Sequence, residues 1–293
     1  MGHHSYSSVT RSARSEKLGY ATKSAQEIFT ARSMNNAMDP NGVTLRESRD
    51  SAEHPDSVPI ILALDVTGSM GSIPHFLVKE GLPHMMEKIM AGGVKDPQVL
   101  FMGIGDHECG DRAPLQIGQF ESGDGELDHW LTTIYLEGGG GGNDGESYHL
   151  AWMFGGRYTA HDRMDKRKKK GILFTIGDEH VLPNIPAHAQ QKIMGPGQYS
   201  DTTNTELLDR ARKLYDVYHL HLKQGTNGMR QDVQDGWKQL LGSDNVVLVE
   251  RREDVAQFIA DKVLEVMGGQ GGQQNIPEPV TEGSDGGDDP MML

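Results

Sequence analysis

Runs of apolar residues alternate with amphipathic segments through most of the chain. Six short runs, each bounded by turn residues, have the length and content of strands buried on both faces. They are residues 58–64, 98–104, 115–120, 171–176, 217–222 and 245–249. The segments between and after them repeat apolar residues at helical spacing, at residues 73–90, 126–135, 145–154, 205–215, 229–241 and 253–267.

This alternation predicts an α/β fold: a doubly wound, mostly parallel six-stranded sheet with helices on both faces. Residues 115–120 follow the preceding strand with no helix between them, so we expect this run to be an antiparallel strand at the edge of the sheet. Pro83 falls inside the helical segment 73–90 and is expected to kink it.

The two ends of the chain differ from this central region in composition. Residues 1–57 are rich in Ser, Arg, Asn and Asp, with a short amphipathic stretch at residues 21–31, and we expect an extended N-terminal arm. Residues 268–293 are rich in Gly and carry five acidic residues and no basic one. Such a segment buries too little apolar surface to offset its ordering entropy, so we expect a disordered acidic tail. The predicted folded domain is therefore residues 58–267.

Charge and composition narrow the possible partners. The formal net charge of −14 argues against nonspecific nucleic-acid binding, which needs clustered Lys and Arg. The basic run at residues 166–170 leads into a strand and is most simply a solvated loop. The lone Cys109 rules out an intramolecular disulfide and fits a reducing compartment. No run approaches the roughly 18 apolar residues of a membrane span, so we expect a cytoplasmic protein that does not bind membranes.

One turn carries the residue types of a metal site. Asp65, Thr67 and Ser69 follow the first apolar run directly and place a carboxylate and two hydroxyls together. Hard oxygen ligands of this kind prefer Mg²⁺ or Mn²⁺ to softer metals. Asp106 and Asp178 follow two other strands, and the ends of parallel strands meet at one edge of a sheet. Helix capping by Thr67 and Ser69 would explain the first turn alone, but not the two further acidic loops.

A glycine-rich stretch, residues 138–142, adds a further source of ligands. Glycines let the backbone approach an ion closely, and Asn143, Asp144 and Glu146 supply oxygens near the start of the next helix. A zinc site at His107 and Cys109 is disfavoured, because no partner pair with zinc-ligand spacing accompanies them.

These motifs resemble the metal-ion-dependent adhesion site of the von Willebrand factor A (vWA) domain family, which has a Rossmann-like fold. That site uses Asp-x-Ser/Thr-x-Ser after the first strand, Thr or Asp in a glycine-rich loop, and Asp after the fourth strand. Asp65, Thr67 and Ser69 match the first element, and Asp178 matches the last. The resemblance covers about residues 58–267 and is closest to the bacterial and phage branch.

The middle loop departs from the family pattern and leaves its ligand open between Asn143 and Asp144. If Asp144 contributes, three carboxylates surround a dication, and an acidic partner group is disfavoured by repulsion. If Asn143 contributes, two carboxylates balance the ion and a partner carboxylate could complete the site.

The resemblance implies a non-enzymatic domain that binds a partner protein through a bound Mg²⁺ or Mn²⁺. It also implies a partner such as an AAA+ ATPase or another component of an intracellular assembly. One alternative is a phosphohydrolase of the haloacid-dehalogenase type with Asp65 as nucleophile, although Thr67 stands where such enzymes carry a second Asp. Another is a structural component of a phage or secretion assembly.

Overall fold

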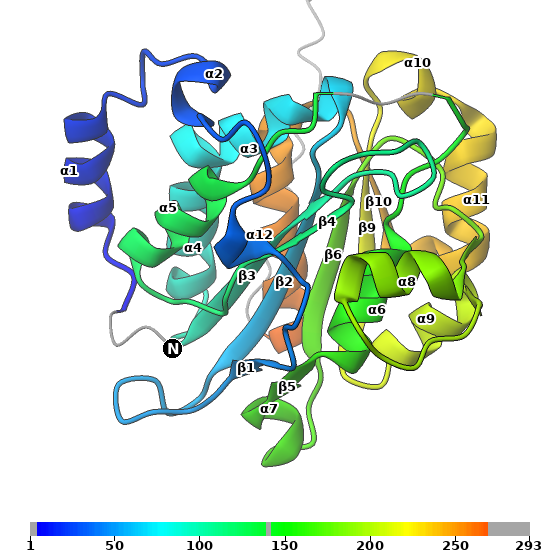
Figure 1. Ribbon diagram of the computed structural model, residues 1–293. Helices are drawn as coiled ribbons and strands as arrows, with labels where there is room; N and C mark the ends of the chain where they lie inside the picture. The colour runs from blue at the N-terminus through cyan, green and yellow to red at the C-terminus, as the bar shows by residue number, and fades with distance from the viewer. Residues whose placement is uncertain (1–4, 139–141, 269–293) are drawn as a thin grey trace, which may run out of the picture.

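A central six-stranded sheet organises the molecule in the computed structural model, which describes residues 5–138 and 142–268 (Figure 1). The strand order is β10-β9-β6-β2-β3-β4. All neighbours pair in parallel except β3 and β4, which are antiparallel. The predicted fold class and the antiparallel edge strand are therefore confirmed. The strands are β2 (Val58–Asp65), β3 (Pro97–Ile104), β4 (Leu115–Ile117), β6 (Gly171–Gly177), β9 (Tyr215–Leu222) and β10 (Val246–Val249).

Helices cover both faces of this sheet (Figure 1). Residues that alternate along β2 enter two separate apolar clusters, with Ile60 and Leu62 in one and Ile61 and Ala63 in the other. This is why the strand sequence is apolar at every position. The first cluster packs under α3 (Ser72–Phe76), α4 (Leu82–Ala91), α5 (Asp124–Thr133) and α12 (Val255–Met267), and the second under α6 (His149–Arg157), α8 (Ala187–Met194), α9 (Asn204–Ala211) and α11 (Gln231–Leu241).

The helical segment that contains Pro83 is divided by a π-helical turn. This turn, η3 (Leu77–Gly81), lies between α3 and α4, directly before the proline. Pro83 has no backbone N–H to donate, and a π turn changes which carbonyls are paired. The local irregularity expected at Pro83 thus takes the form of a π turn.

The segment before β2 is partly helical rather than extended. It forms α1 (Ser8–Leu18), α2 (Ala25–Ile28), the 3-10 turn η1 (Asn36–Met38) and β1 (Arg46–Ser48), which pairs in parallel with β5 (Thr159–His161). Ser7 caps the N-terminus of α1, where its side chain accepts a hydrogen bond from the Thr10 N–H, and Gly19, with φ 68°, caps the C-terminus. The segment contributes Tyr6, Tyr20, Ile28, Phe29 and Met38 to the first apolar cluster.

Polar contacts anchor α1, which explains why apolar periodicity did not reveal it. The Arg11 side chain is 1% exposed and donates to the Asp128 carboxylate and to the Val78 carbonyl of the π turn. The Tyr20 hydroxyl donates to the other oxygen of Asp128 at 2.8 Å. The side chain that carries the docking of α1 is therefore a cation, not an apolar residue.

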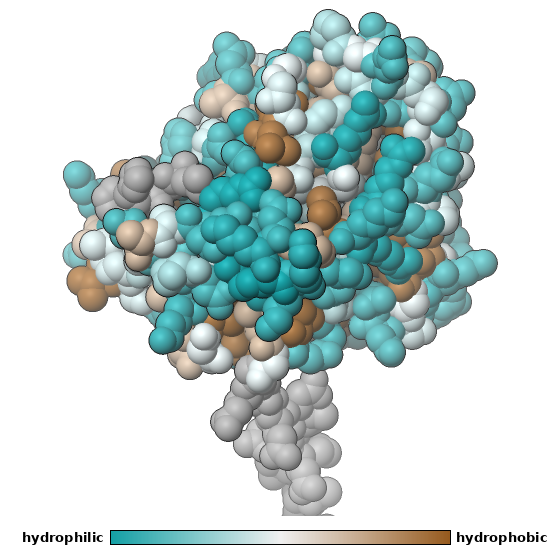
Figure 2. Space-filling model, turned by 90° about the horizontal axis from the view of Figure 1, so that it is seen from below, coloured by the Kyte–Doolittle hydropathy of each residue, from teal (hydrophilic) through white to brown (hydrophobic). Residues whose placement is uncertain are grey.

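Figure 2 shows the molecule from the end where β1 and β5 lie, a face covered largely by hydrophilic residues. Basic side chains of the run at residues 166–170 are paired here with acids. Arg167 donates to Asp50 at 2.8 Å, and Lys166 contacts Asp162 at 2.7 Å. These ion pairs lower the pKa of Asp50 even though its partial burial acts to raise it. The basic run is thus largely neutralised within the molecule.

The remaining elements are short. They are η2 (Gly68–Gly71), α7 (Asp162–Asp165), β7 (Asn184–Ile185), β8 (Thr202–Thr203), α10 (Gly225–Gly228), η4 (Ser243–Asn245) and η5 (Arg252–Asp254). Among the described residues, no helix combines the length and apolarity needed to cross a membrane. The expected acidic tail lies outside the described residues beyond Gly268.

Candidate functional site

Three buried acids follow neighbouring strands at the edge of the sheet where the parallel strands end, here called the carboxyl edge. Asp65 is the last residue of β2, Asp106 follows β3, and Asp178 follows β6. Asp65 is level with Ile104 of β3, and Leu64 is level with Ile176 of β6. The side chains are 1%, 1% and 5% exposed. The sequence prediction that these acids share one edge therefore agrees with the strand register.

Asp65 is held by hydrogen bonds to both carboxylate oxygens. Its Oδ1 accepts from the Thr67 N–H at 2.9 Å and from the Thr67 hydroxyl at 2.7 Å. Its Oδ2 accepts from the Tyr148 hydroxyl at 2.7 Å. Tyr148 is fully buried at the start of α6 and packs edge-on against Trp237 and His219. The orientation of Asp65 is thus fixed from two sides, once by its own turn and once by a distant residue.

Glu146 brings a further carboxylate to the same place. It lies after the glycine-rich stretch and is 4% exposed. Its side chain forms a hydrogen bond with the Thr67 side chain, and its Oε2 is buried with no hydrogen-bond partner among the described residues. Oδ2 of Asp106 is also buried and unpartnered in this part of the chain. Two carboxylate oxygens near the carboxyl edge therefore have no hydrogen-bond donor among residues 5–138 and 142–268.

The raised pKa values of Asp65, Asp178 and Glu146 reflect burial and mutual repulsion. Burial and then the charges of Asp65 and Glu179 raise the pKa of Asp178 to about 7. Burial also raises the pKa values of Asp65 and Glu146, and the hydrogen bonds from Thr67 and Tyr148 offset part of the effect at Asp65. Among the described residues, carboxyl groups are therefore gathered at this edge without a matching positive charge, so their ionised forms are unfavourable, and a bound cation would stabilise these forms.

The two candidates from the glycine-rich loop lie in other contacts. The Asn143 side chain is exposed and its Nδ2 donates to Glu108 at 3.3 Å. Asp144 is 64% exposed at its side chain and pairs with Arg230, which donates to its Oδ2 at 3.0 Å and lowers its pKa. The structure thus brings Asp65, Thr67 and Asp178 to the site, but engages Asn143 and Asp144 elsewhere. Ser69 lies in η2, and the position of its side chain is outside the described part of the structure.

The donor set fits a divalent cation bound partly through hydroxyls and water. No group of three or more His, Cys, Asp or Glu side chains in the described ranges could hold a metal ion by itself. The combination of Asp65, Thr67 and Asp178 instead offers hard oxygen atoms of the kind that Mg²⁺ takes while keeping several waters. Glu146 is the residue that sequence reasoning left out of the ligand set, although its unpartnered burial marks it clearly in the structure.

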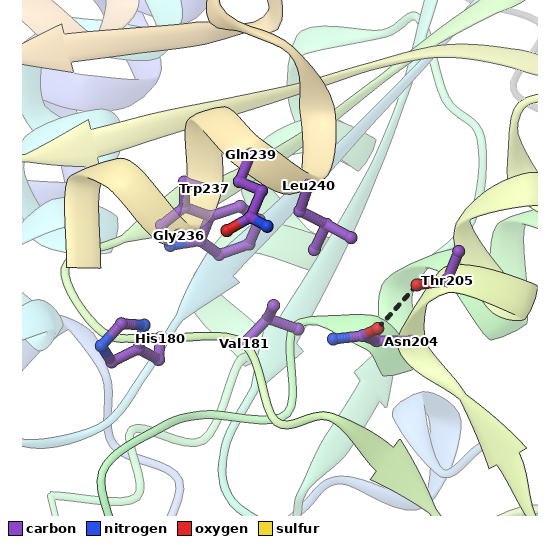
Figure 3. Close-up of a pocket in the computed structure, with 8 residues that line it drawn as sticks. All are labelled: His180, Val181, Asn204, Thr205, Gly236, Trp237, Gln239 and Leu240. Atoms are coloured by element: carbon purple, nitrogen blue, oxygen red, sulfur yellow. Dashed lines mark hydrogen bonds between the residues drawn. The ribbon is translucent and has the colours of Figure 1, made fainter. Parts of the chain in front are cut away.

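A hollow of about 450 Å³ lies next to the loop that follows Asp178 (Figure 3). His180 and Val181 form one side, Trp237 and Leu240 of α11 face them, and the start of α9 closes a third side. The Trp237 indole N–H donates to the Glu179 carbonyl at 2.8 Å and so ties α11 to this loop. The remaining lining residues are Asn204, Thr205, Gly236 and Gln239.

Comparisons with known proteins find likeness in structure but not in sequence. No protein-family profile matches the chain, and no curated protein matches it. The pilus adhesin SpaC from Lactobacillus rhamnosus GG, in its open conformation, has 11% identity and a TM-score of 0.47, with 75% of this chain and 31% of the adhesin covered. Proximal thread matrix protein 1 from the mussel byssus has 11% identity and a TM-score of 0.44, with 75% and 49% covered.

A third similar structure is the conserved hypothetical protein BatB from Bacteroides thetaiotaomicron. It has 14% identity and a TM-score of 0.43, and 72% of this chain and 99% of BatB are covered. The chain spans about a third of the adhesin and about half of the byssus protein.

Proposed function

We propose that the chain is a non-enzymatic protein-binding domain of the vWA type, which engages a partner protein through a divalent cation at its carboxyl edge. The observation that carries the proposal is the cluster of buried acids at this edge: Asp65 and Asp178 have raised pKa values, and two carboxylate oxygens of the cluster have no hydrogen-bond partner among the described residues. The vWA assignment is supported by the order of Asp65, Thr67, Ser69 and Asp178 along a doubly wound fold.

The residues of the proposed site would contribute to cation binding in different ways. Asp65 and Asp178 would supply charge, and Thr67 and Ser69 would supply neutral hydroxyl oxygens. Tyr148 and the Thr67 N–H hold Asp65 in one orientation, so little order is lost when a cation binds. When bound, Mg²⁺ or Mn²⁺ supplies a positive charge and a coordination position for an oxygen of the partner.

The partner is proposed to be a protein within a cytoplasmic assembly, such as an AAA+ ATPase. The net charge of −14 and the internal neutralisation of the basic run support a protein partner over a nucleic acid. Phosphohydrolase activity is disfavoured because Thr67 stands where enzymes of the haloacid-dehalogenase type carry the second Asp that acts as general acid.

Calorimetric titration with Mg²⁺ and Mn²⁺ tests the proposal. We expect the native chain to bind one divalent cation and Asp65→Ala to lose this binding. Asp144→Asn is the matched control, because it also removes one carboxylate, but from an acid that pairs with Arg230 at the surface. Absence of cation binding by the native chain, or equal binding by Asp65→Ala, would reject the proposal. Turnover of an aryl phosphate that Asp65→Asn abolishes would instead establish the enzyme alternative.

A further inference from the structure

Glu146 is fixed between the two halves of the candidate site by its backbone. Its N–H donates to the His180 carbonyl at 2.8 Å, and its own carbonyl accepts from the Leu182 N–H at 3.0 Å. Both partners belong to the loop that follows Asp178. The backbone of Glu146 is therefore bonded to the loop that follows Asp178, while its side chain reaches Thr67 in the turn that follows Asp65.

The side chain of Glu146 shares one hydroxyl with Asp65. The Thr67 hydroxyl donates to Oδ1 of Asp65 at 2.7 Å, and the same side chain is hydrogen-bonded to Glu146. A hydroxyl has a single proton, so it can donate to only one of the two carboxylates at a time. Oε2 of Glu146 has no partner in the described residues, and the side chain is 96% buried, since 4% is exposed. Burying a polar oxygen without a hydrogen-bond partner is unfavourable, which points to a ligand at this position.

The other polar residues of the glycine-rich loop do not compete for this role. Asn143 donates to Glu108, and Asp144 pairs with Arg230, and both side chains are exposed. Within the described residues, neither side chain forms a hydrogen bond or ion pair with Asp65, Thr67 or Asp178, whereas the Glu146 side chain is hydrogen-bonded to Thr67.

We propose that Glu146 is the acid that the glycine-rich loop contributes to the cation site, where it acts on the Thr67 hydroxyl as a positioning residue. The proposal rests on the cation-binding function given above and adds the chemistry of the partner. Once a bound dication has favoured the ionised form of all three acids, Asp65, Asp178 and Glu146 would together carry three negative charges against the two positive charges of the ion. A partner carboxylate would meet like-charge repulsion, so the partner group is a neutral oxygen: a backbone carbonyl, a side-chain amide or a hydroxyl.

The first test measures Mn²⁺ affinity by calorimetry in variants of this loop. We expect Glu146→Gln to weaken Mn²⁺ binding by about 10- to 100-fold, as loss of a group that orients a metal ligand does. Glu146→Asp, which keeps the charge, should recover part of the loss. Asn143→Ala and Asp144→Asn are matched controls and should bind as the native chain does. Circular dichroism and thermal unfolding check that each variant is folded, and if Glu146→Gln does not fold, Glu146→Asp compared with the controls replaces it.

The second test probes the charge of the site with acetate, followed by the electron paramagnetic resonance signal of bound Mn²⁺. Excess acetate should leave the signal of the native chain unchanged and should alter the signal of Glu146→Gln, because that variant has lost one negative charge. An altered signal in the native chain, or no change in either protein, would overturn the assignment of a neutral partner group.

The two proposals fail in different ways. Unchanged Mn²⁺ affinity in Glu146→Gln, together with complete loss in Asp65→Ala, would overturn the role of Glu146 and leave the cation site in place. Failure of the native chain to bind Mn²⁺ would reject the cation site itself.

Discussion

Replacing Asp178 by Asn should stabilise the protein when no divalent cation is present. The pKa of Asp178 rises from 3.8 to about 7 in the folded state, through burial and the charges of Asp65 and Glu179. A carboxyl group with a raised pKa keeps its proton in the folded state while the unfolded chain releases it. Its contribution to stability is therefore fully present below about pH 4 and is lost as the pH rises from about 4 to about 7.

The size of the effect follows from the same shift. Each unit of pKa corresponds to about 1.4 kcal/mol, so about three units give an upper bound near 4 kcal/mol. Proteins respond to such charges with an effective dielectric constant of about 20, which reduces the expected gain to about 1–3 kcal/mol. For a domain of this size that is a rise in Tm of about 3–8 °C.

Thermal unfolding in chelator, at about pH 8 and about pH 5, measures this prediction. Asp178→Asn should unfold at a higher temperature than the native chain at the higher pH, and the difference should shrink at the lower pH. Saturating Mn²⁺ should reverse the order, because a ligand that binds only the folded state stabilises the native chain more. A variant that is less stable than the native chain in chelator at the higher pH would refute the reasoning. Asp144→Asn is the control, and its unfolding temperature should change in the opposite direction, because Arg230 lowers the pKa of Asp144 and so stabilises its ionised form.

Three further substitutions test features that hold the fold. Arg11→Ala leaves the Asp128 carboxylate buried without its cation, so the free energy of unfolding in urea should fall by about 3–5 kcal/mol. A decrease below about 1 kcal/mol would show that α1 is not docked through this pair. Tyr148→Phe removes the donor to Oδ2 of Asp65 and should lower the free energy of unfolding in urea and chelator by about 1–3 kcal/mol. An unchanged unfolding midpoint would contradict this prediction. Lys168 has a positive φ of 55°, which glycine adopts without strain, so Lys168→Gly should stabilise the protein by about 0.5–1 kcal/mol in thermal unfolding. A less stable variant would show that the contacts of the lysine side chain outweigh the backbone strain.

The sheet could be predicted from sequence because its strands have an unambiguous pattern. Residues 58–64 are apolar at every position, and the strand found there is β2 (Val58–Asp65), which is buried on both faces. Residues 115–120 lack a preceding helix, and β4 (Leu115–Ile117) is accordingly antiparallel. Apolar periodicity reports elements that are held by apolar contacts, and these strands are held in that way.

Elements anchored by polar contacts were beyond the reach of this pattern. Helix α1 (Ser8–Leu18) buries a guanidinium rather than an apolar stripe, so its sequence resembles a solvated arm. The division of the chain at residue 58 stays a prediction, but the part described before it includes helices and core residues.

The position of the candidate site in the fold could be predicted from sequence, but not every residue that lies in it. The ends of parallel strands share an edge, so Asp65 and Asp178 could be brought together from topology alone. The direction of a side chain in an irregular loop depends on backbone angles that spacing does not determine. The sequence therefore left the ligand of the glycine-rich loop open between Asn143 and Asp144, whereas the carboxylate that reaches Thr67 belongs to Glu146. The ligand set itself stays a prediction.

The contact of Arg11 with the Val78 carbonyl joins the start of the chain to the helical segment that leads away from the Asp65 turn. Together with the contacts of Thr10 and Tyr20 to α5, this guanidinium would pass tension near the N-terminus on to the π turn and from there toward α3 and η2. An assembly that pulls on the N-terminal residues would in this way act on the Asp65 turn, without any of these residues touching that turn.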